Sequence, residues 1–232
     1  KTAITRSLQD YRVASIEVVI TDPMILYLEV DTTVFYDDTR TIRDNSGIIS
    51  AVRSTLDSAA VSGSIDKFGG AARFSRIVSA IDSADTAITR NTTKIVMRKD
   101  FRAVIDTPAS YEICFEQGFQ VNTQTAVINS TGFTLAGDTR IYYFEDNTQG
   151  IIYKYYFDQN GIKVPVNEEF GTIDYVKGEI MLGYKTPVTF TSTVVPGNII
   201  QVRAFPLGQD VVAKKSIFLD LDVENSKISA LV

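Results

Sequence analysis

Histidine is missing from this sequence, and cysteine occurs once. Without histidine the chain cannot build a serine–histidine–aspartate triad, a cysteine–histidine pair or a histidine zinc site from its own residues. The single Cys114 also excludes an intrachain disulfide and a thiolate metal cluster. Because Cys114 lies in a predicted strand, a small buried hydrophobic residue is favoured over a reactive thiol.

Concentrated positive charge and long apolar runs are lacking too. The formal net charge is -5 at pH 7, which argues against a general nucleic-acid-binding role because affinity for phosphates rests on clustered Lys and Arg. The longest apolar runs, around residues 16–20 and 24–28, are far too short to span a bilayer. We therefore expect neither a nucleic-acid partner nor a membrane.

The chain also has no initiator Met and no signal peptide pattern. It begins at Lys1, so we expect a fragment of a longer protein. Its 232 residues are enough for one large or two modest domains with a sizeable core.

Two amphipathic helices are predicted between residues 44 and 84. The apolar positions of the first recur at roughly helical spacing and are Ile48, Ile49, Val52, Leu56 and Ala59. Those of the second are Phe74, Ile77, Val78 and Ile81. The candidate N-caps of the first helix are Asp44, Asn45 and Ser46. Neither helix can bury its apolar stripe alone, so both need a sheet.

Strands are predicted on both sides of these helices, at residues 15–20, 24–36 and 95–105. In the second of them, alternate residues from Leu26 to Tyr36 share one face. The third is interrupted by the charged Arg98-Lys99-Asp100, which indicates one strand with a loop or two paired strands. This order suits an antiparallel or mixed sheet with both helices on one face.

Beyond residue 107 the helical period disappears, and short strands alternate with turns. Asn160-Gly161 is the strongest hairpin signal, since both residues tolerate the positive φ of a type I′ turn. The sequence therefore predicts an α+β fold in which residues 1–106 form an α+β domain and residues 107–232 a β-rich hairpin domain.

Catalytic, cofactor and metal signatures are not found. Asp220, Asp222 and Glu224 alternate as on the solvated face of a half-buried strand, and the calcium-loop pattern is not completed. Gly69-Gly70 precedes a helix, but both glycine-rich phosphate signatures are missing, so a tight connection is favoured. We therefore predict no catalytic residue, no cofactor and no metal.

Two groups of residues remain as candidates for contacts with other proteins. Tyrosine and Arg are enriched at protein interfaces. The favoured alternative is a solvated strand edge or loop for the basic group, and core packing with cross-strand pairing for the aromatic group. The candidates are the basic Arg98, Lys99 and Arg102 and, as exposed aromatics, Tyr142, Tyr153 and Tyr155.

The order of segments in the first half is more specific than any single motif. A strand over 16–20 and the strand reaching Tyr36 precede the helix at 48–60; Phe68-Gly69, the helix at 74–81 and Ile95-Val96-Met97 then follow. This order resembles the baseplate J-like family of contractile phage tails, over roughly residues 1–105. Within the family the chain is most similar to the C-terminal part of the baseplate wedge proteins of T-even-type phages. It differs from many members in having no Val-Pro-Gly-Val-like stretch after the second helix.

The resemblance implies a structural protein without enzymatic activity. Its implied partners are a second copy, forming a homodimer, and other baseplate wedge subunits, which together build the ring around the tail hub. It also implies a late protein found in the virion, at the tail baseplate, and assembled in the host cytoplasm. The tyrosine-rich hairpins leave one alternative from another class, a carbohydrate- or cell-surface-binding module of a tail appendage.

Overall fold

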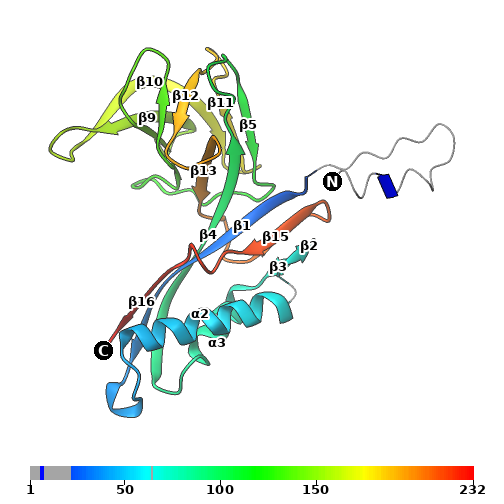
Figure 1. Ribbon diagram of the computed structural model, residues 1–232, viewed down its shortest axis with the longest axis vertical. Coiled ribbons are helices and arrows are strands. Elements are labelled where there is room, and N and C mark those ends of the chain that lie inside the picture. Colours follow the sequence, from blue (N-terminus) through cyan, green and yellow to red (C-terminus); the bar gives the residue numbers. More distant parts are fainter. Residues whose placement is uncertain (1–5, 8–21, 64) are drawn as a thin grey trace.

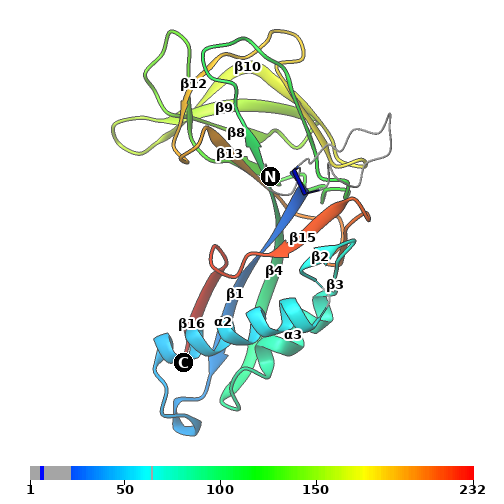
Figure 2. The same ribbon diagram turned by 45° about the vertical axis from the view of Figure 1, so that its right-hand side comes forward.

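The computed structural model describes residues 6–7, 22–63 and 65–232. Two lobes are joined by a narrow waist (Figure 1). One lobe carries the helices and the other is built from strands, and a view turned by 45° shows the same separation (Figure 2). Over the described residues the protein is mostly β-sheet with two α-helices, broadly an α+β fold. The strand expected at residues 15–20 lies outside this part of the chain.

Two long antiparallel strands run along the helical lobe to the waist, β1 (Met24–Tyr36) and β4 (Ile88–Arg102). The prediction for 24–36 is confirmed, and alternate side chains from Leu26 to Tyr36 are buried. The interruption predicted at Arg98-Lys99-Asp100 is wrong. β4 continues through these charges because a further strand, β13 (Ile199–Ala204), pairs with its second half.

The C-terminal strands return to the helical lobe. β15 (Ile217–Leu221) and β16 (Lys227–Leu231) pair in parallel with successive parts of β1, which makes the sheet mixed. β2 (Lys67–Phe68) pairs with β15. The separation of the chain into domains at residues 106 and 107 stays a prediction.

Both predicted helices form. α2 (Asn45–Ser62) follows the short 3-10 helix η1 (Asp38–Arg40), and α3 (Phe74–Asp82) comes later. The backbone N–H of Gly47 donates to the Asp44 carboxylate at 2.8 Å, so Asp44 is the N-cap of α2. The two helices contact each other, while α2 lies against β15 and β16 and α3 against β4. The side chains of Ile48, Val52, Leu56, Ile77 and Ile81 are buried there.

The other lobe is made of strands that continue the same sheet beyond β13. Its strands are β5 (Tyr111–Cys114), β6 (Ile128–Ser130), β7 (Phe133–Leu135), β8 (Tyr142–Asp146), β9 (Ile151–Phe157), β10 (Lys163–Asp174), β11 (Glu179–Leu182) and β12 (Phe190–Thr193). Along the sheet the order is β13-β6-β8-β9-β10-β11-β5, with β7 pairing β8 and β12. A separate two-stranded sheet joins β3 (Ala71–Ala72) to β14 (Val211–Val212).

The hairpin between β9 and β10 is confirmed, but its type I′ turn is wrong. Gly161 has a φ of 74°, whereas Asn160 is not among the residues with positive φ. The N–H of Gly161 donates to the carbonyl of Asp158 at 3.0 Å. The loop is thus a turn closed from Asp158 to Gly161 with one left-handed residue at its end, a common alternative to the two-residue type I′ loop.

Candidate functional site: the ionic network at the waist

The waist is the place where β4 passes from one pairing partner to another. At Arg98, β4 has Tyr27 of β1 on one side and Arg203 of β13 on the other. Each lobe therefore supplies one neighbour to the same residue. Arg98 is only 3% exposed, so its charge needs partners inside the protein.

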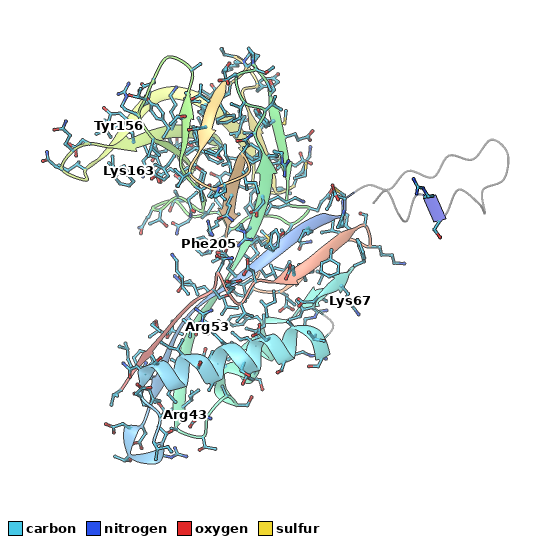
Figure 3. All side chains as sticks on the ribbon, in the orientation of Figure 1. Arg43, Arg53, Lys67, Tyr156, Lys163 and Phe205 are labelled. Atoms are coloured by element: carbon cyan, nitrogen blue, oxygen red, sulfur yellow. The ribbon has the colours of Figure 1, made fainter. Side chains whose placement is uncertain are left out.

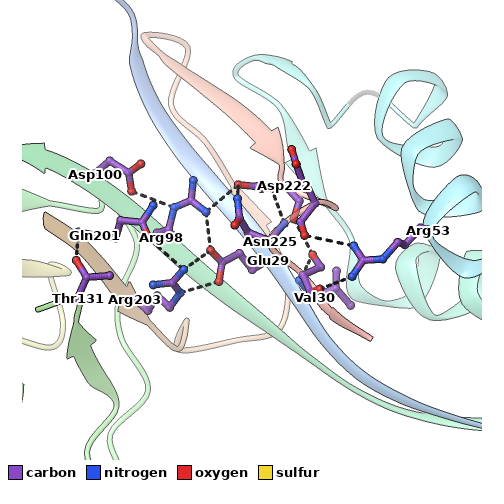
Figure 4. A network of polar contacts seen from close by, with 12 residues as sticks. Glu29, Val30, Arg53, Arg98, Asp100, Thr131, Gln201, Arg203, Asp222 and Asn225 are labelled. Atoms are coloured by element: carbon purple, nitrogen blue, oxygen red, sulfur yellow. Dashed lines mark hydrogen bonds and ion pairs between the residues drawn. The ribbon is translucent and has the colours of Figure 1, made fainter. Parts of the chain in front are cut away.

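Carboxylates from three segments surround this buried guanidinium (Figure 4). Nη1 of Arg98 donates to Glu29 of β1 at 2.6 Å and to Asp222, which follows β15, at 2.7 Å. Nε of Arg98 donates to Asp100 at 2.9 Å. Arg203 binds both oxygens of Glu29, at 2.8 and 2.9 Å, in a bidentate pair. Glu29 thus joins the arginines of β4 and β13.

The electrostatics of the site keep Arg98 and Asp222 charged. Burial lowers the pKa of Arg98, but hydrogen bonds to Glu29 and Asp222 and the charge of Asp100 outweigh burial and raise that pKa above its usual value. Burial raises the pKa of Asp222, but hydrogen bonds from Asn225 and Arg98 outweigh it and hold the pKa below its usual value. Arg98 and Asp222 are therefore held in their ionised forms at neutral pH.

The network continues to α2 through the loop between β15 and β16. Arg53, on α2 (Figure 3), donates to the backbone carbonyls of Val223 and Ser226. The Ser226 hydroxyl accepts from the N–H of Val30 at 2.9 Å and donates to the carbonyl of Asp222 at 2.7 Å. One connected set of contacts therefore reaches from α2 across β1 and β4 to β13.

This arrangement holds parts of the protein together through charge-assisted hydrogen bonds. Each carboxylate of the network is already bonded to a cation, and the sequence has no histidine to move a proton. A small cleft beside it, about 90 Å³, is lined by residues that include Glu29, Arg203 and Lys227. The site's capability is mechanical, because it fixes the strands of the two lobes relative to one another.

A second cluster of ionisable side chains lies on β5 and β11. Donor atoms of Glu112, Cys114 and Glu179 lie within 4.8 Å of one another, the one such group in the described part of the chain. Cys114 is half-buried, not fully buried as expected, and its Sγ donates to Glu112 at 3.5 Å. Burial and the nearby carboxylates raise the pKa of the Cys114 thiol, which opposes the thiolate that metal binding requires.

The basic residues predicted for an interface do not form one surface. Arg98 is buried in the network, so the exposed or solvated-edge position expected for it is wrong, because β4 is flanked by strands on both sides. Lys99 is half-buried, and burial lowers the pKa of its ammonium group. Arg102 is exposed at the end of β4. The interface role itself stays a prediction.

The predicted aromatic group is divided between two faces of a sheet. Tyr142 and Tyr155 are 4% and 8% exposed, so the expectation that they are exposed is wrong. Tyr142 donates to Asp138 at 2.6 Å, whereas Tyr155 packs on the opposite face with its ring 5.5 Å from that of Tyr143. Tyr153 is half-buried beside Tyr155 and donates to Glu145. Cross-strand packing, the favoured alternative, accounts for these contacts.

Of the charged side chains bonded around Arg98, sequence reasoning missed four: Glu29, Asp100, Arg203 and Asp222. One signal was available for Glu29, which stands between Leu28 and Val30 in an otherwise apolar part of β1. A charge in such a run indicates a buried ion pair. Its partners lie 69 and 174 residues away, and no local pattern identifies them.

Comparison with known proteins gives one finding for the helical lobe. A search of curated proteins returns no match to the chain. None of the helices in the described residues is long and apolar enough to cross a membrane. Residues 24–100 match a family of structural phage baseplate proteins. The matched segment begins at the first residue of β1 and ends two residues before the end of β4. The match supports a structural role in the baseplate, because the helical lobe of the chain is similar to the family described as baseplate structural protein gp6, C-terminal domain III.

Proposed function

We propose that the chain is a structural subunit of the baseplate wedge of a contractile phage tail. It self-associates as a dimer and contacts other wedge subunits to build the ring around the tail hub. It is a late protein without enzymatic activity, assembled in the host cytoplasm and carried in the virion. The observation that supports this function best is the family match over residues 24–100.

The connection between the lobes favours this role. A ring subunit must keep its contact surfaces at fixed positions while neighbours pull on it. Here β4 is shared by both lobes, and Glu29, Arg98 and Arg203 link β1, β4 and β13 at the waist. Buried, mutually hydrogen-bonded charges resist sliding of one strand past another, because a slip leaves a charge unpaired in the interior.

Self-association is tested first on exposed residues. Arg102→Glu reverses a charge at the exposed end of β4, and Arg76→Glu on the exposed face of α3 is the matched control. In sedimentation equilibrium we expect the unsubstituted chain and the control to form a discrete dimer, and Arg102→Glu to weaken it. A dimer of equal strength in all three removes Arg102 from the interface. A monomer throughout contradicts self-association by this chain.

Baseplate membership is tested on particles. Mass spectrometry of purified tails, with and without the baseplate, should find the full-length protein in the complete tail and lose it with the baseplate. Tails that are assembled and infectious without the protein would refute the proposed role.

Carbohydrate binding is the second candidate function. The rings of Tyr143 and Tyr155 are stacked at 22°, and Phe157 beside them is 50% exposed. Of these three rings Phe157 is the exposed one, and an exposed aromatic ring is able to stack on a sugar. A glycan array measures it directly, with Phe157→Ser as the variant expected to lose any signal; an array without hits eliminates this candidate.

A further inference from the structure

The helices of the described residues cover only one face of the sheet in the helical lobe. α2 and α3 pack on the face that holds the buried alternate residues of β1, from Leu26 to Tyr36. The odd-numbered residues of β1 point to the opposite face, where β4 and β16 flank the strand. We call the part of this face that surrounds residues 31–35 the outer face. Sheets covered on one side commonly expose a polar face to water, so the charges of the outer face decide whether it has a further role.

Three strands place one row of charged side chains on the outer face. Asp31 of β1 lies in register between Lys227 of β16 and Lys94 of β4, and residues in register share a face. All three are exposed. Neither lysine has an ion pair or a hydrogen bond with a described residue, although both flank Asp31. Both ammonium groups are therefore available to a ligand.

A third cation lies further along the same face. Phe35 stands four residues after Asp31, roughly 13 Å along the strand, and is in register with Arg90 and Leu231. Cζ of Arg90 lies 3.8 Å from the centre of the Phe35 ring. Stacking uses the flat side of the guanidinium and leaves the N–H groups in its plane free to donate. Arg90 has no ion pair with any residue that the structure describes, and Leu231 beside it is 48% exposed.

Small hydroxyl side chains separate these two rows. The hydroxyls of Thr33 and Ser229 are 3.0 Å apart and share a hydrogen bond, and the exposed Thr92 lies opposite Thr33 on β4. A partner can approach closely here because no long side chain stands in the row. The outer face thus carries three cations and one carboxylate, whereas the whole chain has a formal net charge of -5.

We propose that the outer face binds an acidic surface of a neighbouring wedge subunit. Carboxylates of the partner pair with Lys94, Lys227 and Arg90, and an apolar side chain of the partner covers Leu231. Asp31 disfavours a nucleic acid, because its carboxylate repels a phosphate chain that runs between the two lysines. The identity of the partner as a wedge subunit rests on the proposed function; the preference for carboxylates does not.

The test measures fluorescence anisotropy of a fluorescein-labelled decapeptide of alternating glutamate and serine with the complete chain. The matched probe has glutamine in place of every glutamate, and an oligothymidylate of equal length tests for phosphates. Low and moderate salt are compared, because screening should weaken ion pairs at an exposed face.

The main variant removes both free lysines of the outer face, as Lys94→Gln with Lys227→Gln. The matched control is Lys67→Gln with Lys215→Gln, which removes two exposed lysines near β2 and β15 that also have no ion pair with a described residue. A third variant, Asp31→Asn, removes the one carboxylate of the outer face. All five positions are exposed, so the variants should keep the fold.

We expect the glutamate peptide to bind the unsubstituted chain and the control alike, and more weakly at moderate salt. The main variant should lose about five- to twentyfold in affinity, because each exposed ion pair contributes a factor of up to about five. Asp31→Asn should bind more tightly, since a repelling charge is removed. No binding, equal binding of the glutamine peptide, an equal loss in the control, weaker binding by Asp31→Asn, or a preference for oligothymidylate would overturn the proposal.

These outcomes are separate from those that test baseplate membership. A protein found in the baseplate that ignores the glutamate peptide refutes the role of the outer face and leaves the proposed function standing. A protein that binds the peptide through Lys94 and Lys227 but is not in the tail keeps the carboxylate-binding face and refutes its assignment to a wedge partner.

Discussion

Replacing Arg98 by methionine tests whether the waist network holds the fold together. The substitution keeps the length and the apolar stem of the side chain but removes the guanidinium. Asp100 and Asp222 lose the cation that they share, and Glu29 keeps only Arg203. Three carboxylates then lie near one cation at a site where the Glu29 and Arg98 side chains are 7% and 4% exposed.

The expected cost follows from this burial. Removing one partner of a buried pair destabilises a protein by about 3–5 kcal/mol, because the remaining charge stays in the interior without compensation. For a chain of this length each 1 kcal/mol lowers Tm by about 2–4 °C, so we expect a decrease of roughly 6–20 °C. Arg73→Met is the matched control, since Arg73 and Asp210 are 54% and 45% exposed and such a pair contributes about 1 kcal/mol or less.

Thermal unfolding and urea unfolding of the two variants and the unsubstituted chain measure this difference. Small-angle X-ray scattering of the folded proteins adds the separation of the two lobes, which we expect to vary more in Arg98→Met. Equal Tm values for Arg98→Met and Arg73→Met would refute the reasoning, because the buried network would then contribute no more than a surface ion pair.

Three further predictions concern substitutions of single residues. Burial, Asp66 and Asp222 raise the pKa of Asp220, so ionised Asp220 disfavours the folded state, and Asp220→Asn should stabilise the chain at pH 7. This gain should disappear as the pH falls below about 3.8, where the carboxyl is protonated in both states; urea titrations at several pH values check the sign. Asp44→Ala removes the N-cap of α2 and should lower the free energy of unfolding, measured with urea, by about 1 kcal/mol. A change near zero would count against a stabilising role of this cap. Gly161→Ala should lower the free energy of unfolding by about 1–2 kcal/mol, because residue 161 has a left-handed backbone. Gly178→Ala should lower it clearly more, because the added Cβ would lie 1.8 Å from the carbonyl oxygen of Gln117. Equal losses in the two variants would contradict this.

The elements of the helical lobe are predictable because their signals are local. The alternation along β1 is visible within one segment of the sequence, and so are the apolar stripes of α2 and α3. The N-cap Asp44 directly precedes its helix. Each of these patterns describes which side of an element is buried. Nothing further is needed to place the element.

The waist is not predictable in the same way. Arg98-Lys99-Asp100 has the composition of a solvated loop, and it becomes part of a strand only because β13, a hundred residues later, pairs with it. The turn at Asn160-Gly161 shows the same limit on a smaller scale, since the loop length there is set by Asp158 and the pairing of β9 with β10. Long-range pairing overrides local preference at both places.

The charges at the waist are better explained by geometry than by stability. Apolar residues of similar size often replace a buried ion pair without loss of stability, so stability alone does not require Glu29, Arg98 and Arg203. An apolar contact tolerates sliding, whereas a bidentate pair and a guanidinium bonded to three carboxylates have few positions in which every donor is satisfied. Because these bonds cross from β1 through β4 to β13, they select one register at the place where the two lobes share a strand. A subunit that must present both lobes at a fixed angle needs this selectivity at its waist more than elsewhere.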